Sequence, residues 1–193
     1  MSIHHHFLLH KPYKYLSQFV NNQSRRKNKK LLGELHDFPE GIMSIGRLDE
    51  DSEGLLLLTT DGLESQRVRS KKVEKEYYVQ VDGIITEAAI EKIRRGLTIS
   101  IYGKPYNTIP CKASLLINEP VFKPRTKKIR DKAHGPTSWA SITLTEGKFR
   151  QVRKMTALVG YPTLRLIRVR IGAIKLDKLE AGQVMKVNHF KLS

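Results

Sequence analysis

The sequence predicts an α+β protein, because its expected strands outnumber its helices and the two do not alternate in regular order along the chain. Four consecutive leucines, residues 55–58, are bounded by polar residues on both sides, as in a strand buried on both faces. Residues 75–81 instead alternate, with Tyr77, Val79 and Val81 on one face, which indicates a second strand. A buried strand is a rigid support for a loop that must hold one side chain in place.

The first half of the chain contains further, shorter elements. Residues 21–30 are polar and strongly basic, which is typical of a surface loop. Lys71 and Lys72 interrupt a short helix that begins at Asp61-Gly62. The elements expected here are strands at residues 7–10, ended by Lys11-Pro12, and at residues 42–45, and the helix at residues 63–68.

The second half is expected to begin with a helix that Thr86 caps, that carries apolar residues at helical spacing, and that ends at Gly96. Residues 118–136 contain three prolines and six lysines or arginines with little periodicity. A connection this long is usually functional or disordered. The remaining expected elements are strands at residues 111–117, 139–145, 164–171 and 184–187 and a helix at residues 149–159.

Composition restricts the class of partner. The chain has 193 residues, enough for one domain or two small lobes that share a core, and a net charge of +16 from 35 Lys and Arg against 19 Asp and Glu. This surplus attracts polyanions, so nucleic acid is the expected partner and an anionic membrane surface the second. No stretch reaches the roughly 20 apolar residues of a membrane span, and the single Cys111 fits a reducing, cytoplasmic compartment. A basic ribosome-associated protein without catalysis would have the same composition.

An acidic loop, residues 49–53, precedes the leucine strand and is the first candidate for chemistry. Its four acids begin with Asp49, directly at the end of the preceding strand. The loop imitates the opening of a calcium site, but that motif needs an acid at its twelfth position, which here is Thr60. The histidines beyond residue 6 also lack companions at metal-ligand spacing, so we expect no metal site. Solvated turn residues are the alternative for the other three acids, Glu50, Asp51 and Glu53.

A second constellation lies at residues 146–160. Lys148, Arg150 and Arg153 gather at the amino end of the expected helix, where the helix dipole disfavours each cation by roughly 0.3–1 kcal/mol. Such a cost suggests that an anion lies nearby, either a nucleic-acid phosphate, a carboxylate of the protein, or both. An ordinary basic helix face, which also includes Lys154, is the alternative.

Two further features favour contact with RNA or DNA. Tyr77 and Tyr78 lie on opposite faces of their strand, so at most one packs in the core and the other can stack on a base, worth roughly 1–3 kcal/mol. Taken singly, either tyrosine is more often a packed aromatic with a satisfied hydroxyl. Basic tracts lie at residues 25–30 and 123–132 and at Arg165, Arg168 and Arg170, of which the last two share a strand face.

Four motifs, in the same order as in the family, resemble those of the bacterial ribosomal pseudouridine synthases of the group named for the small-subunit enzyme RsuA. They cover residues 7–172, nearly the whole chain. Within the group, residues 136–168 and the basic stretch before them most resemble the pseudouridine synthases that act on the large ribosomal subunit. The motifs read FLLHKPYKYLSQF, GRLDEDSEGLLLLTTDG, KEYYVQVDG and EGKFRQVRKMTALVGYPTLRLIR.

The resemblance implies a catalytic domain with a mixed, mainly antiparallel sheet flanked by helices and an RNA cleft across its middle. It implies that Asp49 is the catalytic aspartate, that Tyr77 is the active-site tyrosine, and that Arg153 pairs with the aspartate. Arg47 occupies the arginine position of the GRLD motif, and Lys14 replaces a glycine common in the opening motif, which puts the local turn in question. RNA contacts are expected from Lys75, Lys148, Arg150, Lys154, Arg168 and Arg170.

The domain expected from this resemblance is a single one over residues 1–193, with two sub-lobes that share one sheet. The small RNA-binding domain that precedes the opening motif in many relatives is expected to be absent. The expected partner is large-subunit ribosomal RNA or its assembly intermediate, with no membrane, and the protein is expected to be a monomer.

The chemistry of uridine isomerisation matches these residue types. The glycosidic bond must break, the uracil must turn, and the base must rejoin the sugar through carbon. These steps need a nucleophilic carboxylate, a cation that keeps it ionised and a platform for the detached base, for which Asp49, Arg153 and Tyr77 are the candidates. No metal or organic cofactor is required, and the target nucleotide must leave its stack. Attack on the ring, attack on the sugar and elimination at the sugar all stay open.

Two other functions remain open at this point. The first is a non-catalytic ribosomal RNA-binding or assembly factor with the same fold. The second is a metal-dependent nuclease that would use Asp49, Asp51 and Glu53 and would lose activity in EDTA.

Overall fold

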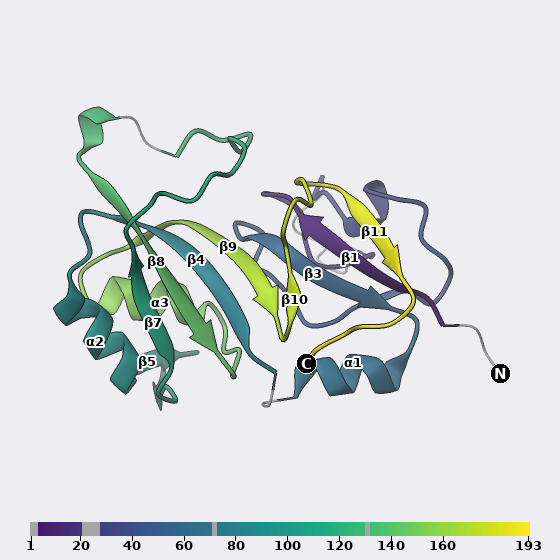
Figure 1. Cartoon of the computed structure of the whole chain (residues 1–193), viewed down its shortest axis with the longest axis horizontal. Coiled ribbons are helices and arrows are strands. Elements are labelled where there is room, and N and C mark those ends of the chain that lie inside the picture. The colour runs from purple at the N-terminus through teal and green to yellow at the C-terminus, as the bar shows by residue number, and fades with distance from the viewer. Residues whose placement is uncertain (1–3, 21–27, 71–72, 130–131) are drawn as a thin grey trace. The chain divides into compact units, whose positions relative to one another are not determined.

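The computed structural model describes residues 4–20, 28–70, 73–129 and 132–193, which form two compact units (Figure 1). The first unit combines residues 1–73 with residues 168–193, and the second consists of residues 74–167. Strands and helices occur in both units, so the predicted α+β class is confirmed. Most of the predicted basic loop at residues 21–30, and the predicted helix break at Lys71-Lys72, lie outside the described residues.

The first unit is built around the leucine strand, β3 (Glu53–Thr59). Every residue of β3 is buried, as predicted for a strand covered on both faces. The strand pairs antiparallel with β1 (His6–Lys11), and β1 pairs antiparallel with β11 (Val184–Val187). The smaller pairings are β2 (Met43–Ser44) with β3, and β10 (Ile174–Lys175) with the end of β9 (Thr163–Ile171).

One side of this unit is closed by aromatic packing. Phe7 of β1 is buried, and its ring meets that of Phe38 edge to face at a centroid distance of 5.5 Å. Phe19 meets Phe38 in the same way at 5.4 Å. The short 3-10 helix Leu32–Glu34 contributes the fully buried Leu32 to the same cluster. The segment between β1 and β2 is thereby packed against β1.

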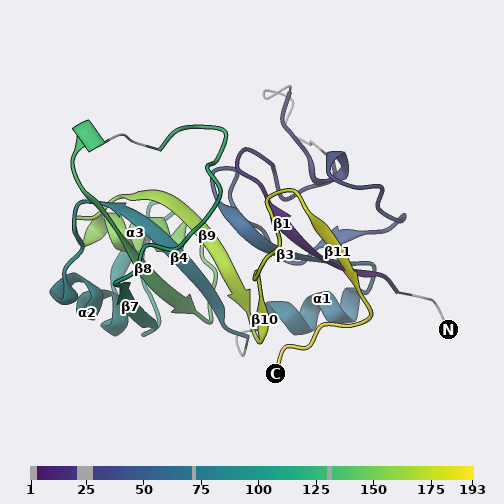
Figure 2. The same cartoon turned by 45° about the horizontal axis from the view of Figure 1, so that its top comes forward.

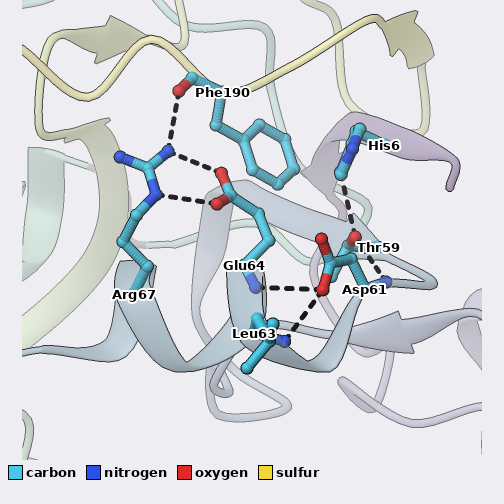
Figure 3. A network of polar contacts seen from close by, with 7 residues as sticks. All are labelled: His6, Thr59, Asp61, Leu63, Glu64, Arg67 and Phe190. Atoms are coloured by element: carbon cyan, nitrogen blue, oxygen red, sulfur yellow. Dashed lines mark hydrogen bonds and ion pairs between the residues drawn. The ribbon is translucent and has the colours of Figure 1, made fainter.

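Helix α1 (Gly62–Arg69) follows β3 directly. The Asp61 carboxylate accepts hydrogen bonds from two backbone N–H groups of the first turn at 2.9 and 3.3 Å, so the predicted helix start is confirmed. Figure 3 shows the next step of this network, in which Glu64 pairs with Arg67 and the Arg67 guanidinium also donates to the carbonyl of Phe190. Helix α1 is thus tied to the segment that follows β11.

The second unit consists of paired strands with two helices packed against them. The predicted caps of α2 (Glu87–Arg95) are confirmed: Thr86 accepts from the Ala89 N–H, and Gly96 has a φ of 92°. The core of this unit joins Val79 and Ala140 of the strands to Ile90 and Met155 of the helices. The strands are β4 (Lys75–Asp82), β8 (Thr137–Leu144) and β7 (Lys112–Leu116), paired antiparallel in that order, with the beginning of β9 beside β4.

The connection between β7 and β8 extends away from the strands that it joins (Figures 1 and 2). It is anchored by Phe122, whose ring lies 6.0 Å from Trp139 and 6.4 Å from Tyr78, measured between centroids. Arg165 covers the same ring at 5.5 Å and donates to the carbonyl of Lys123 at 3.1 Å. The described part of the predicted long connection is therefore held against its own unit around Phe122.

Several features differ from the expected elements. The hairpin of β5 (Thr98–Ile101) and β6 (Lys104–Asn107), and the short strand β10, are not predicted by the sequence because each is too short for a clear alternation. Helix α3 (Gln151–Leu158) begins two residues later than expected, since Arg150 adopts a left-handed φ of 53° at the N-cap. Among the residues that the structure describes, no helix has the length and apolarity of a membrane crossing.

Candidate active site

The acidic loop is positioned through its backbone by the segment that follows β1. The Ser17 hydroxyl accepts from the Leu48 N–H at 2.9 Å and donates to the Leu48 carbonyl at 2.8 Å. The Asp49 carbonyl then accepts from the Ser52 N–H at 3.0 Å, which closes a tight turn. Both peptide groups of Leu48 are therefore occupied just before Asp49, whose side chain is half-buried.

Lys14 provides the next anchor. Its N–H donates to the Glu50 carbonyl at 2.8 Å, and its φ of 70° lies in the left-handed region that favours glycine. The glycine common at this position of the opening motif is explained by that conformation. The turn is kept here with a lysine, whose ammonium lies 3.5 Å from the Glu50 carboxylate.

The acids of the loop are not merely solvated. Glu50 accepts from Lys29 through both carboxylate oxygens at 2.7 Å, and this contact lowers the pKa of Glu50 below its ordinary value. Glu53 is only 2% exposed and belongs to β3. The alternative that these acids are solvated turn residues is therefore wrong for Glu53, which is buried, and for Glu50, which is paired with Lys29. Asp49 and Asp51 are half-buried.

A fully buried lysine lies close to these acids, and the sequence analysis did not single it out. Lys11, at the end of β1, is 0% exposed, and its ammonium donates to the carbonyls of Pro12 and Tyr15 at 2.8 and 2.7 Å. Burial lowers the pKa of Lys11 to about 7. The charges that oppose this shift are Glu53, Asp51, Asp49 and Glu50.

The lowered pKa of Lys11 predicts that the free energy of unfolding depends on pH. Between pH 7 and pH 10.5, the pKa of Lys11 in the unfolded chain, the unfolded chain binds a proton at Lys11 that the folded chain lacks. The free energy of unfolding therefore increases with pH over this range. We expect an increase of about 1–3 kcal/mol between pH 7 and pH 9, by urea unfolding, that Lys11→Met abolishes. Lys104→Met, an exposed position, should keep the wild-type dependence. Equal pH profiles for wild type and Lys11→Met would refute the shift.

In the second unit, a buried glutamate positions the start of α3. Glu146 is 7% exposed and accepts from the Tyr106 hydroxyl, from the Ile109 N–H at 2.9 Å and from the Gln151 side chain at 2.6 Å. The Glu146 carboxylate raises the pKa of Tyr106 through this hydrogen bond. Gln151 in turn accepts from the Lys148 N–H at 3.0 Å. Glu146 and Gln151 are positioning residues that the sequence analysis did not assign, although both lie within its closing motif.

The two tyrosines of β4 lie on opposite faces, as predicted. Tyr77 packs against the core of the second unit, and Tyr78 faces the Phe122 ring on the other side. Arg153 lies half-buried on α3 of the same unit. Asp49 and Arg47 belong to the first unit, where the Arg47 side chain is exposed. The roles of these four residues stay predictions.

The predicted RNA-contacting residues differ in exposure. Arg168 is 5% exposed, and its Nε donates to the Leu55 carbonyl of β3 at 2.7 Å. Arg170 donates to the Gly172 carbonyl at 2.8 Å and is half-buried. A guanidinium that is enclosed like that of Arg168 offers little surface to a phosphate. The remaining four, Lys75, Lys148, Arg150 and Lys154, are half-buried or exposed.

Among the described residues, neither a metal cluster nor a reactive thiol is found. The parts of the chain that the structure describes contain no group of three His, Cys, Asp or Glu side chains that could hold a metal ion. This finding gives no support to a metal-dependent nuclease. Burial raises the pKa of Cys111 to about 11, so its thiol is protonated near neutral pH and is a poor nucleophile.

Comparisons with known proteins agree on one family. The family described as RNA pseudouridylate synthase matches residues 5–158. The ribosomal large subunit pseudouridine synthase E of Vibrio vulnificus is 39% identical over 185 residues, which are 94% of this chain and 74% of the relative. The enzyme of that name from Xanthomonas axonopodis is 40% identical over 174 residues, 89% of this chain and 88% of the relative. A crystal structure of a pseudouridylate synthase, 27% identical, superposes with a TM-score of 0.75 and covers 97% of this chain and 71% of that one.

Proposed function

Because the chain belongs to the RNA pseudouridylate synthase family, we propose that it isomerises a specific uridine of large-subunit ribosomal RNA, with Asp49 as the catalytic carboxylate. The relatives that are named for this activity on the large subunit support the substrate class. The proposed role of Asp49 is supported by the way in which the backbone of the acidic loop is held. Its backbone is held at Leu48 by Ser17 and at Glu50 by Lys14, so one carboxylate is presented from a fixed turn.

The proposed reaction is balanced without a co-reactant. The N1–C1′ bond of the uridine breaks and a C5–C1′ bond forms, while the proton on C5 leaves and a proton is taken up on N1. Asp49 supplies the nucleophile at the sugar or the ring. Arg153 is proposed to keep Asp49 ionised, Tyr77 to support the detached uracil, and Arg47 to assist beside the aspartate.

The charge distribution supports an RNA partner. The net charge of +16 favours encounter with a polyanion. We assign phosphate contacts to Lys75, Lys148, Arg150, Lys154 and Arg170, and none to the enclosed Arg168. The protein is proposed to act as a monomer in the cytoplasm, on ribosomal RNA or an assembly intermediate.

Pseudouridine mapping tests this proposal. Ribosomal RNA from cells that lack the gene should miss a pseudouridine of 23S RNA, and the purified protein should restore it on deproteinised transcript. The 16S RNA of the same cells is the internal control and should keep its pattern. An unchanged 23S map, together with no product in the purified reaction, would overturn the proposed function.

A further inference from the structure

An exposed pair of stacked aromatic rings lies at the tip of the β5–β6 hairpin. The rings of Tyr102 and Phe149 are 5.4 Å apart between centroids and nearly parallel, with an angle of 13° between their planes. Tyr102 is 80% exposed and Phe149 48% exposed. The pair therefore presents a flat aromatic surface to solvent within the second unit. Neither residue is among the site residues that the sequence predicts.

The backbone under Tyr102 is in an unfavourable conformation for a tyrosine. Tyr102 and Gly103 form the two-residue turn between β5 and β6, and both have positive φ, 51° and 80°. Turns with this geometry prefer asparagine followed by glycine, because a bulky side chain at positive φ is strained. Core packing does not account for the tyrosine, since most of the side chain is exposed. Strain of this kind at an exposed position is typical of functional sites.

Two lysine ammonium groups are held against the β5–β6 hairpin that carries Tyr102. The Lys154 ammonium lies 5.2 Å from the centroid of the Phe149 ring and donates to the Ser100 carbonyl of β5 at 2.6 Å. The Lys148 ammonium lies 4.6 Å over the ring of Tyr106 on β6. Positive charge held beside an exposed ring suits a ligand that has both phosphates and flat bases.

We propose that Tyr102, backed by Phe149, is a stacking platform for an unpaired base of RNA, and that Lys148 and Lys154 contact the neighbouring phosphates. Single-stranded RNA fits better than an acidic peptide, because carboxylates would use the lysines but not the exposed face of the tyrosine ring. The platform extends the proposed function, since it adds an RNA contact beyond the residues assigned to the reaction.

Binding of a fluorescein-labelled uridine 12-mer, measured by anisotropy at fixed salt, tests the platform. Tyr102→Phe should bind like the wild type, whereas Tyr102→Ala and Tyr102→Asn should bind about 5- to 150-fold more weakly. A 12-mer of abasic ribose phosphates should bind all four proteins equally. Ile84→Ala, an exposed apolar position of the same unit, is the matched control and should bind like the wild type.

The asparagine variant separates binding from folding. Because asparagine suits the positive φ of the turn, Tyr102→Asn should melt at or above the wild-type temperature while it binds the uridine 12-mer less tightly. Wild-type affinity of Tyr102→Asn and Tyr102→Ala for the 12-mer would overturn the platform. An equal loss on the abasic strand would overturn stacking as its mechanism. Pseudouridine formation by the wild type is scored separately, so its absence would count against the proposed function and not against the platform.

Discussion

Replacing Asp49 by asparagine is expected to lower the rate of pseudouridine formation on 23S RNA by at least about 1,000-fold. Asparagine has nearly the same shape but cannot act as a carboxylate nucleophile. The turn around Asp49 is held by backbone groups of Leu48 and Ser52 rather than by the side chain alone, so folding should change little. The rate is measured in single turnover on transcript, and RNA affinity is measured in parallel.

Asp51→Asn is the matched control for this experiment. Asp51 belongs to the same acidic loop and is half-buried like Asp49, so its substitution should change the rate by less than about tenfold. Retention of RNA binding by Asp49→Asn, with loss of product, separates an enzyme from a non-catalytic assembly factor. Wild-type turnover by Asp49→Asn would show that the catalytic carboxylate is another residue.

Replacing Gly54 by alanine is expected to destabilise the protein by at least about 3 kcal/mol. Gly54 is the second residue of β3 and has a φ of 107°, and a Cβ there would lie 2.3 Å from the carbonyl oxygen and 2.6 Å from the amide nitrogen of Arg168. These are backbone atoms of β9, which cannot move away as a flexible side chain would. The free energy of unfolding in urea measures the effect.

Gly62→Ala provides the control for the loss of a glycine. Gly62 is the first residue of α1, and no atom lies within 4 Å of the position that its Cβ would occupy. Alanine there should leave stability unchanged or raise it by up to about 1 kcal/mol. If the two alanine variants unfold at the same urea concentration, the close approach of β9 to Gly54 is refuted.

Local patterns in the sequence were sufficient for most of the elements. The leucine strand and the caps Thr86 and Gly96 were predictable because neighbouring residues determine them. The left-handed turn at Lys14 could be placed by its family motif but not by its own side chain, which prefers another conformation.

Features that depend on distant segments were not predictable in this way. Arg168 was expected at the surface as part of a basic tract, yet it is enclosed because it bonds to Leu55, 113 positions earlier in the chain. Ser17 supports Leu48 across 31 positions, and no local pattern signals that contact. The burial of Lys11 has the same origin, since alternation along β1 alone gives no reason to enclose an ammonium.

The first unit is completed by residues 168–193, which are synthesised after the whole of the second unit. Strand β11 pairs with β1, and the Phe190 carbonyl is bound by Arg67, 123 positions earlier, so in both contacts the partners lie on either side of the second unit in the sequence. Residues 74–167 are contiguous and can fold while synthesis continues, because domains generally fold as units as they emerge. The contact of β9 with β3, the strand that follows the acidic loop, must wait for residues 168–171. A nascent chain stalled before that point would carry the motif of the acidic loop without its finished scaffold, which makes maturation of the carboxylate depend on residues that are synthesised after the whole second unit.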